Sequence, residues 1–261
     1  MPSRVLGLLL RYGYLYRRSL ARSMELFFWP VMDLLVWGFL SVYLQRVAAP
    51  RAVSYLVGAL ILWDILYRCQ QAITLSVTED IWVKNILNLF IAPVRPAELL
   101  LATCVVGVVK AAIPGVLLTV LALVLYDFHL LALGAPLAPF LASLLLFGWA
   151  VGIFTAALIL RFGQSAEALV WGIPFVLQPF SAVFYPVEVL PGWARAIALA
   201  LPSTHVFEGM RAVMAGEGLR GSALAASFGL NALYLAAGAS FFAWMLGRVR
   251  EKGYLGRLGM E

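Results

Sequence analysis

Apolar runs of about 20 residues recur along the 261-residue chain and restrict its fold more than any other feature. A hydrocarbon core about 30 Å thick needs roughly 20 apolar residues for each helical span. The chain is 63% hydrophobic and 12% charged, with a mean hydropathy of +0.94, whereas soluble proteins carry about 25% charged residues. The sequence therefore predicts an all-α polytopic membrane protein. Its six transmembrane helices are expected at about 25–44, 53–75, 99–126, 136–160, 168–187 and 223–246.

The basic residues predict the orientation of these spans, which together form a membrane domain over residues 25–246. With both termini in the cytoplasm, twelve of the 19 Lys and Arg residues lie on that side and five lie outside, as the positive-inside rule requires. We therefore expect a multi-pass protein of the inner or plasma membrane with a basic cytoplasmic tail at 247–261. The formal charge of +6 does not indicate nucleic acid as a partner, because basic residues flank the apolar runs instead of forming a patch.

Four arginines near the N-terminus, Arg4, Arg11, Arg18 and Arg22, are spaced so that they fall on one side of a helix. The spacing predicts an amphipathic interface helix over residues 1–24, lying in the headgroup layer with its basic stripe toward membrane lipids. An ordinary positive flank that only determines topology is the alternative.

A second amphipathic pattern lies between the second and third spans. Trp82, Ile86, Leu89 and Phe90 fall at i, i+4, i+7 and i+8, the spacing of one helix face. We expect a short cytoplasmic helix over about residues 79–92.

Two prolines end this pattern. Pro93 and Pro96 interrupt a helix because proline lacks the amide hydrogen and disfavours helical geometry in the residue before it. Pro96 can also begin the next helix, with Glu98 near its positive end.

Asp33, Asp64, Arg68 and Lys110 are charged residues in the interior of predicted spans. Asp64 and Arg68 are at i and i+4, so they can pair on one helix face and reduce each other's burial cost. Lys110 is expected to reach the cytoplasmic surface or to pair with Asp33 or Asp64.

Small residues in the spans predict close packing. Gly148 and Gly152 have the GxxxG spacing that lets another helix approach closely. Cys69 and Cys104 fall in or beside spans, so we expect small packing residues and not a disulfide or a metal site.

The longest external segment, about residues 188–222, is too apolar for a disordered loop. Two short helices broken at Pro202 would satisfy their own backbone groups while dipping into the outer leaflet. This segment is therefore expected to be a re-entrant external hairpin before the last span.

The order of these features resembles the permeases of the ABC-2 transporter family over essentially the whole chain. The most specific local pieces are 88–96 (NLFIAPVRP), 185–193 (YPVEVLPGW) and 201–205 (LPSTH). The resemblance implies that the first piece belongs to a coupling helix, which docks into a cleft on an ATPase subunit. The docking residues would be Trp82, Lys84, Ile86, Leu89, Phe90, Pro93 and Arg95.

The same resemblance implies roles for two further groups of residues. The re-entrant segment would close the exit side as an external gate that contains Tyr185, Pro186, Pro191, Trp193 and Pro202. The first, second and fifth spans would line a translocation path near Asp33, Trp37, Phe175 and Gln178.

The nucleotide site is expected on another chain. A phosphate-binding loop places its lysine after a glycine, and none of Lys84, Lys110 and Lys252 follows one. ATP and Mg would be bound by two copies of a cytoplasmic ABC ATPase, with a second copy of this chain completing the path. The chain itself would have no cofactor, metal or catalytic residue, and would export an amphiphilic or lipid-linked substrate such as a polysaccharide, glycolipid or drug.

Two other functions remain open at this point. A secondary transporter driven by an ion gradient would show paired repeats and several midplane ionisable groups; the groups are present, but no internal repeat is evident. An intramembrane enzyme could use His205, Glu208 and Arg211 with His129, yet His205 and Glu208 supply only two metal ligands. A helix cap with an internal Glu208–Arg211 pair is the alternative there.

Overall fold

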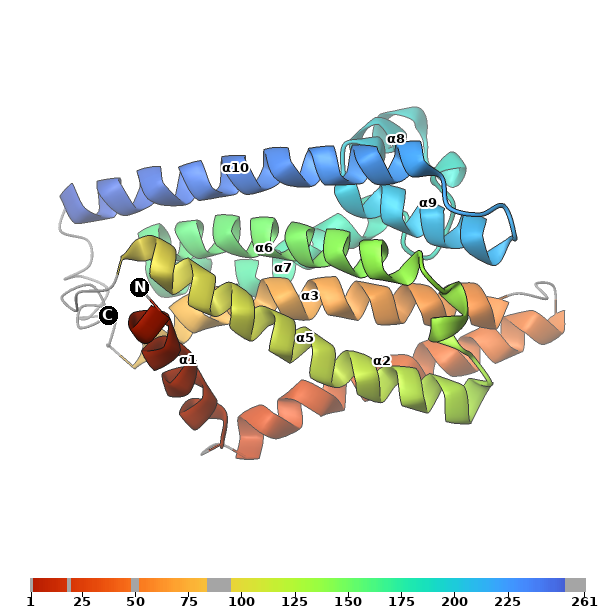
Figure 1. Cartoon of the computed structure of the whole chain (residues 1–261), viewed down its shortest axis with the longest axis horizontal. Helices are drawn as coiled ribbons and strands as arrows, with labels where there is room; N and C mark the ends of the chain where they lie inside the picture. Colours follow the sequence, from red (N-terminus) through yellow and green to blue (C-terminus); the bar gives the residue numbers. More distant parts are fainter. Residues whose placement is uncertain (1, 18–19, 48–51, 84–94, 252–261) are drawn as a thin grey trace.

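The computed structural model of the chain describes residues 2–17, 20–47, 52–83 and 95–251, and every regular element in these ranges is a helix (Figure 1). The long helices are α2 (Leu20–Val47), α3 (Ala52–Trp82), α5 (Pro96–Tyr126), α6 (Leu137–Phe162) and α10 (Gly221–Glu251). The shorter ones are α1 (Pro2–Arg17), α7 (Leu169–Phe180), α8 (Gly192–Leu199) and α9 (Pro202–Met214). The single 3-10 turns are η1 (Leu130–Leu133), η2 (Gly163–Ala166) and η3 (Val187–Val189). The all-helical prediction is confirmed for the described residues.

Four of the described helices, α2, α5, α6 and α10, are long and apolar enough to cross a bilayer. Helix α3 is also long, at 31 residues, but it carries Asp64, Arg68, Glu79 and Asp80. Helix α7 is apolar and has 12 residues. A multi-pass membrane protein is therefore supported, while the second and fifth of the six spans stay predictions.

Helices α3 and α6 form the centre of the bundle: most residues of α3 from 57 to 81 are buried, and α6 is the most buried of the four candidate spans. In the apolar window of α6, 72% of the residues are buried, compared with 17% in α10 and 22% in α2. Two glycines let α6 approach α3: a Cβ on Gly148 would lie 2.9 Å from the Leu66 carbonyl oxygen, and one on Gly152 would lie 2.9 Å from that of Gln70. The close approach predicted from the GxxxG spacing is confirmed, and the approaching helix is α3.

Helix α5 covers α3 from another direction. A Cβ on Gly107 of α5 would lie 3.2 Å from the carbonyl oxygen of Cys69 in α3. Cys69 is buried and free, and Cys104 of α5 is free as well, as expected for packing residues. Helix α3 is therefore covered by both α5 and α6.

Different helices gather at the two ends of the bundle. The start of α1, the end of α3, the start of α5 and the end of α10 gather at one end, and α8 and α9 lie toward the other (Figure 1). Helices α3, α5 and α6 run between the two ends. The cytoplasmic assignment of the first end stays a prediction.

Several boundaries differ from the predicted ones. The helix expected over residues 1–24 ends at Arg17, and Arg22 falls in α2, while Arg18 lies outside the described residues. The fifth span was expected to reach residue 187, but α7 ends at Phe180, because Ala182 takes a positive φ of 51° that no helix continues through.

Around the predicted coupling helix, α3 runs without a break to Trp82, so residues 79–82 form its last turn. Residues 84–94, which hold the rest of that pattern, lie outside the described residues. Helix α5 begins at Pro96 as predicted, and a Glu98 carboxylate oxygen accepts a hydrogen bond from the Arg95 amide at 2.9 Å.

The segment predicted to be external contains two short helices, α8 and α9, and Pro202 is the first residue of the second one. The break at Pro202 is confirmed, since proline is well suited to the first helical position. The insertion of this pair into the outer leaflet stays a prediction.

The contact between α3 and α6 gives a first testable prediction. Gly152→Leu should lower the thermal unfolding temperature of the purified protein in detergent, because a Cβ at 2.9 Å from a backbone oxygen forces the helices apart. Overpacking of this kind typically costs about 1–3 kcal/mol.

Gly229→Leu is the matched control, because Gly229 is also helical and nothing lies within 4 Å of a Cβ built there. An equal loss of stability in both variants would contradict the assigned contact.

Candidate functional site

A cavity of about 640 Å³ lies between α2, α3 and α7. All four residues predicted to lie on the path, Asp33, Trp37, Phe175 and Gln178, line it. The structure thus brings together side chains from two helices that are far apart in the sequence.

Helical periodicity explains why these side chains share one wall. In α2, Trp29, Asp33 and Trp37 are spaced by four residues, so they fall on one face. The cavity face of α7 carries Phe175 and Gln178, which are three residues apart and so also share a face.

Sequence reasoning missed most of the α3 wall and part of the aromatic lining. The aromatic residues are Trp29, Trp37, Trp63, Tyr67, Trp171 and Phe175, and the polar residues are Asp33, Asp64, Arg68, Gln71 and Gln178. Trp63, Tyr67 and Gln71 follow one another at intervals of four along α3, but this helix has apolar residues on all sides, so the spacing alone does not single them out.

The predicted pair of Asp64 and Arg68 is confirmed within this wall. Arg68 Nε donates to Asp64 Oδ1 at 3.1 Å, and the two side chains are only 5% and 9% exposed. Arg68 Nη1 also donates to the side-chain oxygen of Gln71 at 3.3 Å. Arg68, and not Lys110, is therefore the partner of Asp64.

Aromatic contacts join the cavity wall to neighbouring segments. Trp37 stacks on Phe184, with ring centroids 4.4 Å apart and an angle of 15° between the planes. Trp63 lies 6.4 Å from Phe207 of α9. Both contacts link the cavity to the α7–α9 region.

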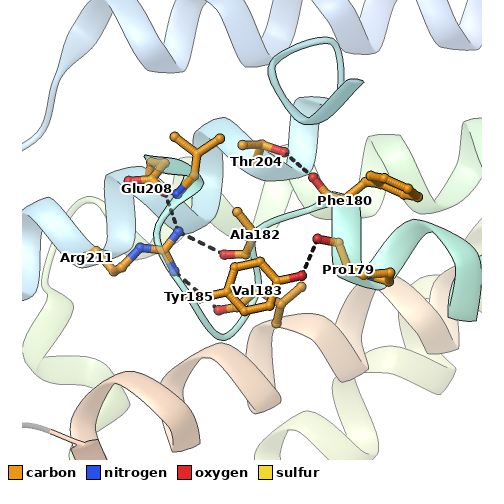
Figure 2. Close-up of polar contacts among 9 residues, drawn as sticks. Pro179, Phe180, Ala182, Val183, Tyr185, Thr204, Glu208 and Arg211 are labelled. Carbon is orange, nitrogen blue, oxygen red and sulfur yellow. Dashed lines mark hydrogen bonds and ion pairs between the residues drawn. The ribbon is translucent and has the colours of Figure 1, made fainter. Parts of the chain in front are cut away.

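Helix α9 holds the turn that follows α7 (Figure 2). Arg211 donates to the carbonyl oxygens of Ala182 at 2.8 Å and Val183 at 3.3 Å, and it pairs with Glu208 at 2.6 Å. Glu208 in turn accepts a hydrogen bond from the Val187 amide at 2.8 Å. These bonds satisfy backbone groups that the turn leaves without helical partners.

The interpretation of Glu208 and Arg211 as an internal pair is therefore confirmed. The His205 ring is hydrogen-bonded to the carbonyl oxygen of Leu199 through Nε2 at 3.0 Å. Among the residues that the structure describes, no group of three His, Cys, Asp or Glu side chains is arranged to hold a metal.

The five predicted gate residues lie in this region. Tyr185 donates a hydrogen bond to the carbonyl oxygen of Pro179 at 2.6 Å (Figure 2). Trp193 is 67% exposed and meets Phe180 edge-on at 6.0 Å. The prolines Pro186, Pro191 and Pro202 precede or begin η3, α8 and α9 respectively.

At the opposite end, α1 is bound to α3 and α5 by ion pairs. Arg11 makes two hydrogen bonds to the carboxylate of Asp80, which is 2% exposed, and Arg4 lies 3.8 Å from Glu98. Burial acts to lower the pKa of Arg11, but the bond and charge of Asp80 outweigh it and raise this pKa. The predicted orientation of the basic stripe toward lipid is therefore wrong for Arg11, which instead pairs with α3.

The predicted docking residues are described only in part. Trp82 is 41% exposed at the end of α3, and its indole nitrogen donates to Glu167 at 3.3 Å. Arg95 is exposed just before α5. The others, Lys84, Ile86, Leu89, Phe90 and Pro93, lie outside the described residues. Glu167 was missed because nothing local in the sequence relates it to Trp82.

These features define a multi-pass helical membrane protein with a partly polar cavity among its helices. A family model described as ABC-2 family transporter protein matches residues 46–248. The chain therefore belongs to the ABC-2 family and is a permease of an ABC transporter. Permeases of this family normally work with an ABC ATPase. A comparison with curated proteins found no match.

The ion pair between α1 and α3 can be measured with a double-mutant cycle. Arg11→Gln and Asp80→Asn should each lower the thermal stability, and the double variant should lose less than the sum of the two. Groups in direct contact typically show a coupling of about 0.5–3 kcal/mol.

The pair of Glu217 and Arg220 provides the control, because its side chains are 53% and 66% exposed. Exposed pairs contribute no more than about 1 kcal/mol. A coupling between Arg11 and Asp80 as small as that of the control pair would contradict the structural role of the first pair.

The bonds from α9 to the turn give a further prediction. Arg211→Met should speed hydrogen exchange at residues 181–187 and lower thermal stability, because buried carbonyl oxygens and Glu208 lose their donor. Leaving such groups unsatisfied costs about 1–3 kcal/mol each. Arg195→Met on the exposed face of α8 is the control. Unchanged exchange at 181–187 in Arg211→Met would contradict the role assigned to Arg211 in holding this turn.

Proposed function

We propose that this chain is the transmembrane subunit of an ATP-driven exporter, with the cavity between α2, α3 and α7 as part of its translocation path. One observation carries the proposal: in a member of the ABC-2 family, Asp33, Trp37, Phe175 and Gln178 line one cavity. Its substrate would be amphiphilic or lipid-linked, since the cavity combines aromatic rings with buried polar groups.

A second copy of the chain would complete this path. Several large apolar side chains on α2 and α7 are exposed beside the cavity, including Phe28, Trp29, Phe175 and Val176. Exposed apolar surface of this extent indicates contact with lipid or with another protein. Pairing of two such faces would enclose a larger path between the copies.

The motor would act at the end of the bundle where α3 ends and α5 begins. Residues 84–94 connect these two helices, with Trp82 exposed on one flank and Arg95 on the other. A docked ATPase, present in two copies with ATP and Mg, would move this connection as it closes. We place this end, and both chain termini, in the cytoplasm.

Helix α3 is the element that would transmit the movement. Its last turn carries Asp80, which binds α1, and its middle carries Asp64 and Arg68 in the cavity wall. Rigid-body displacement of packed helices is a common form of coupling. A shift of α3 would therefore change the cavity directly.

The exit gate would be formed by the α7–α9 region. The bonds from Arg211 and Glu208 tie the turn after α7 to α9, and Phe184 of that turn stacks on Trp37. These contacts support a gate that moves together with the wall of the cavity.

The docking proposal is tested by the double change Trp82→Glu and Phe90→Glu. In vesicles that contain this chain and its ATPase, the variant should lose complex assembly and ATP-dependent transport, because charge on an apolar docking face opposes burial in a groove. The membrane domain should remain folded, with only a small drop in its unfolding temperature, because the exposed hydrogen bond from Trp82 to Glu167 is lost.

Leu131→Glu serves as the control, because Leu131 is 75% exposed in η1, away from the proposed docking site. Persistence of assembly and transport in the Trp82/Phe90 variant would contradict the docking assignment. Transport that needs no ATP and collapses with an ion gradient would instead favour a secondary transporter.

A further inference from the structure

The lining of the cavity between α2, α3 and α7 carries a net negative charge. The described lining residues whose side chains are charged at neutral pH are Asp33, Asp64 and Arg68. The last two form a buried pair at 3.1 Å, which is neutral as a unit. The carboxylate of Asp33 therefore gives the lining one uncompensated negative charge.

No hydrogen bond or ion pair links Asp33 to any other residue in the part of the chain that the structure describes, and Asp33 is exposed on α2. Arg68 faces the same cavity, but its guanidinium is held by Asp64 and Gln71. A carboxylate at membrane depth is costly unless a cation or hydrogen-bond donor accompanies it. A ligand with a positive charge would supply that partner.

The buried carboxylate beside it also has unused acceptor capacity. Asp64 Oδ1 accepts from Arg68, whereas Asp64 Oδ2 is buried and has no hydrogen-bond partner among the described residues. The two carboxylates of the lining thus outnumber its one guanidinium, and an anionic ligand would meet repulsion from Asp33.

The aromatic lining suits an organic cation. Trp29 and Phe175 are 58% and 65% exposed and border the same space as Asp33. Aromatic rings attract organic ammonium groups through their negative faces, and tryptophan does so most strongly. A volume of about 640 Å³ falls within the range of pockets that hold drug-sized ligands.

We propose that this cavity selects amphiphiles that carry a positive charge, with Asp33 as the residue that determines charge preference. The proposal rests on the proposed function, since it names the class of substrate for that path. It favours a cationic, drug-sized amphiphile over a lipid-linked anionic saccharide.

Two probes of nearly equal size and shape but opposite charge, tetraphenylphosphonium and tetraphenylborate, test the proposal. Equilibrium dialysis against the purified chain in an uncharged detergent, with detergent alone as the blank, measures both affinities. We expect the phosphonium to bind at least about tenfold more tightly, as a cation near a carboxylate and aromatic rings should.

Asp33→Asn should remove most of this preference, whereas Asp33→Glu should keep it. Asp127→Asn is the matched control, because it makes the same change at an exposed aspartate outside the cavity. Equal binding of both probes to the unaltered chain would overturn the proposal, as would an unchanged preference in a folded Asp33→Asn variant. The comparison on the unaltered chain decides the question even if that variant does not fold.

This measurement needs neither ATP nor a partner subunit, so it is separate from the test of the proposed function. Loss of charge preference with intact ATP-driven transport would reject only the substrate class. Preferential phosphonium binding without ATP-driven transport would contradict the proposed coupling to an ATPase but not the proposed cation site.

Discussion

The near contact of the α3 and α6 backbones is the constraint on which the rest of the structure depends. Helix α3 carries a buried ion pair that would be costly in lipid, so it needs protein on several sides. Gly148 and Gly152 supply this cover by letting the α6 backbone reach the carbonyl groups of α3. On the side that α5 and α6 leave uncovered, Asp64, Arg68 and Gln71 of α3 face the cavity next to α2 and α7.

Hydrophobic length and periodicity were sufficient to predict the long helices, because each pattern is contained within one segment. The pair of Asp64 and Arg68 was predictable for the same reason, since its partners are one helical turn apart. The four cavity residues on α2 and α7 came from family resemblance combined with this period. The other α3 residues of the wall, Trp63, Tyr67 and Gln71, are uncharged and lie in a helix with apolar residues on all sides, so no local signal distinguishes them.

Contacts between distant segments could not be predicted from local patterns. Arg11 belongs to a stripe that matches a lipid-facing helix, yet it pairs with Asp80, 69 positions further along the chain. The end of α7 was placed too late because nothing near residue 182 in the sequence reveals that Arg211 binds the carbonyl oxygens of the following turn. In both cases a contact with a distant segment determines the structure: where the Arg11 side chain points, and where α7 ends.

The ion pairs of α1 also have a consequence for biosynthesis. Helix α1 is synthesised before its partners Asp80 and Glu98, which lie on helices that emerge later. Helix α1 therefore cannot take its final position until α3 and the start of α5 have been synthesised and inserted. A helix that is made early thus reaches its final position late.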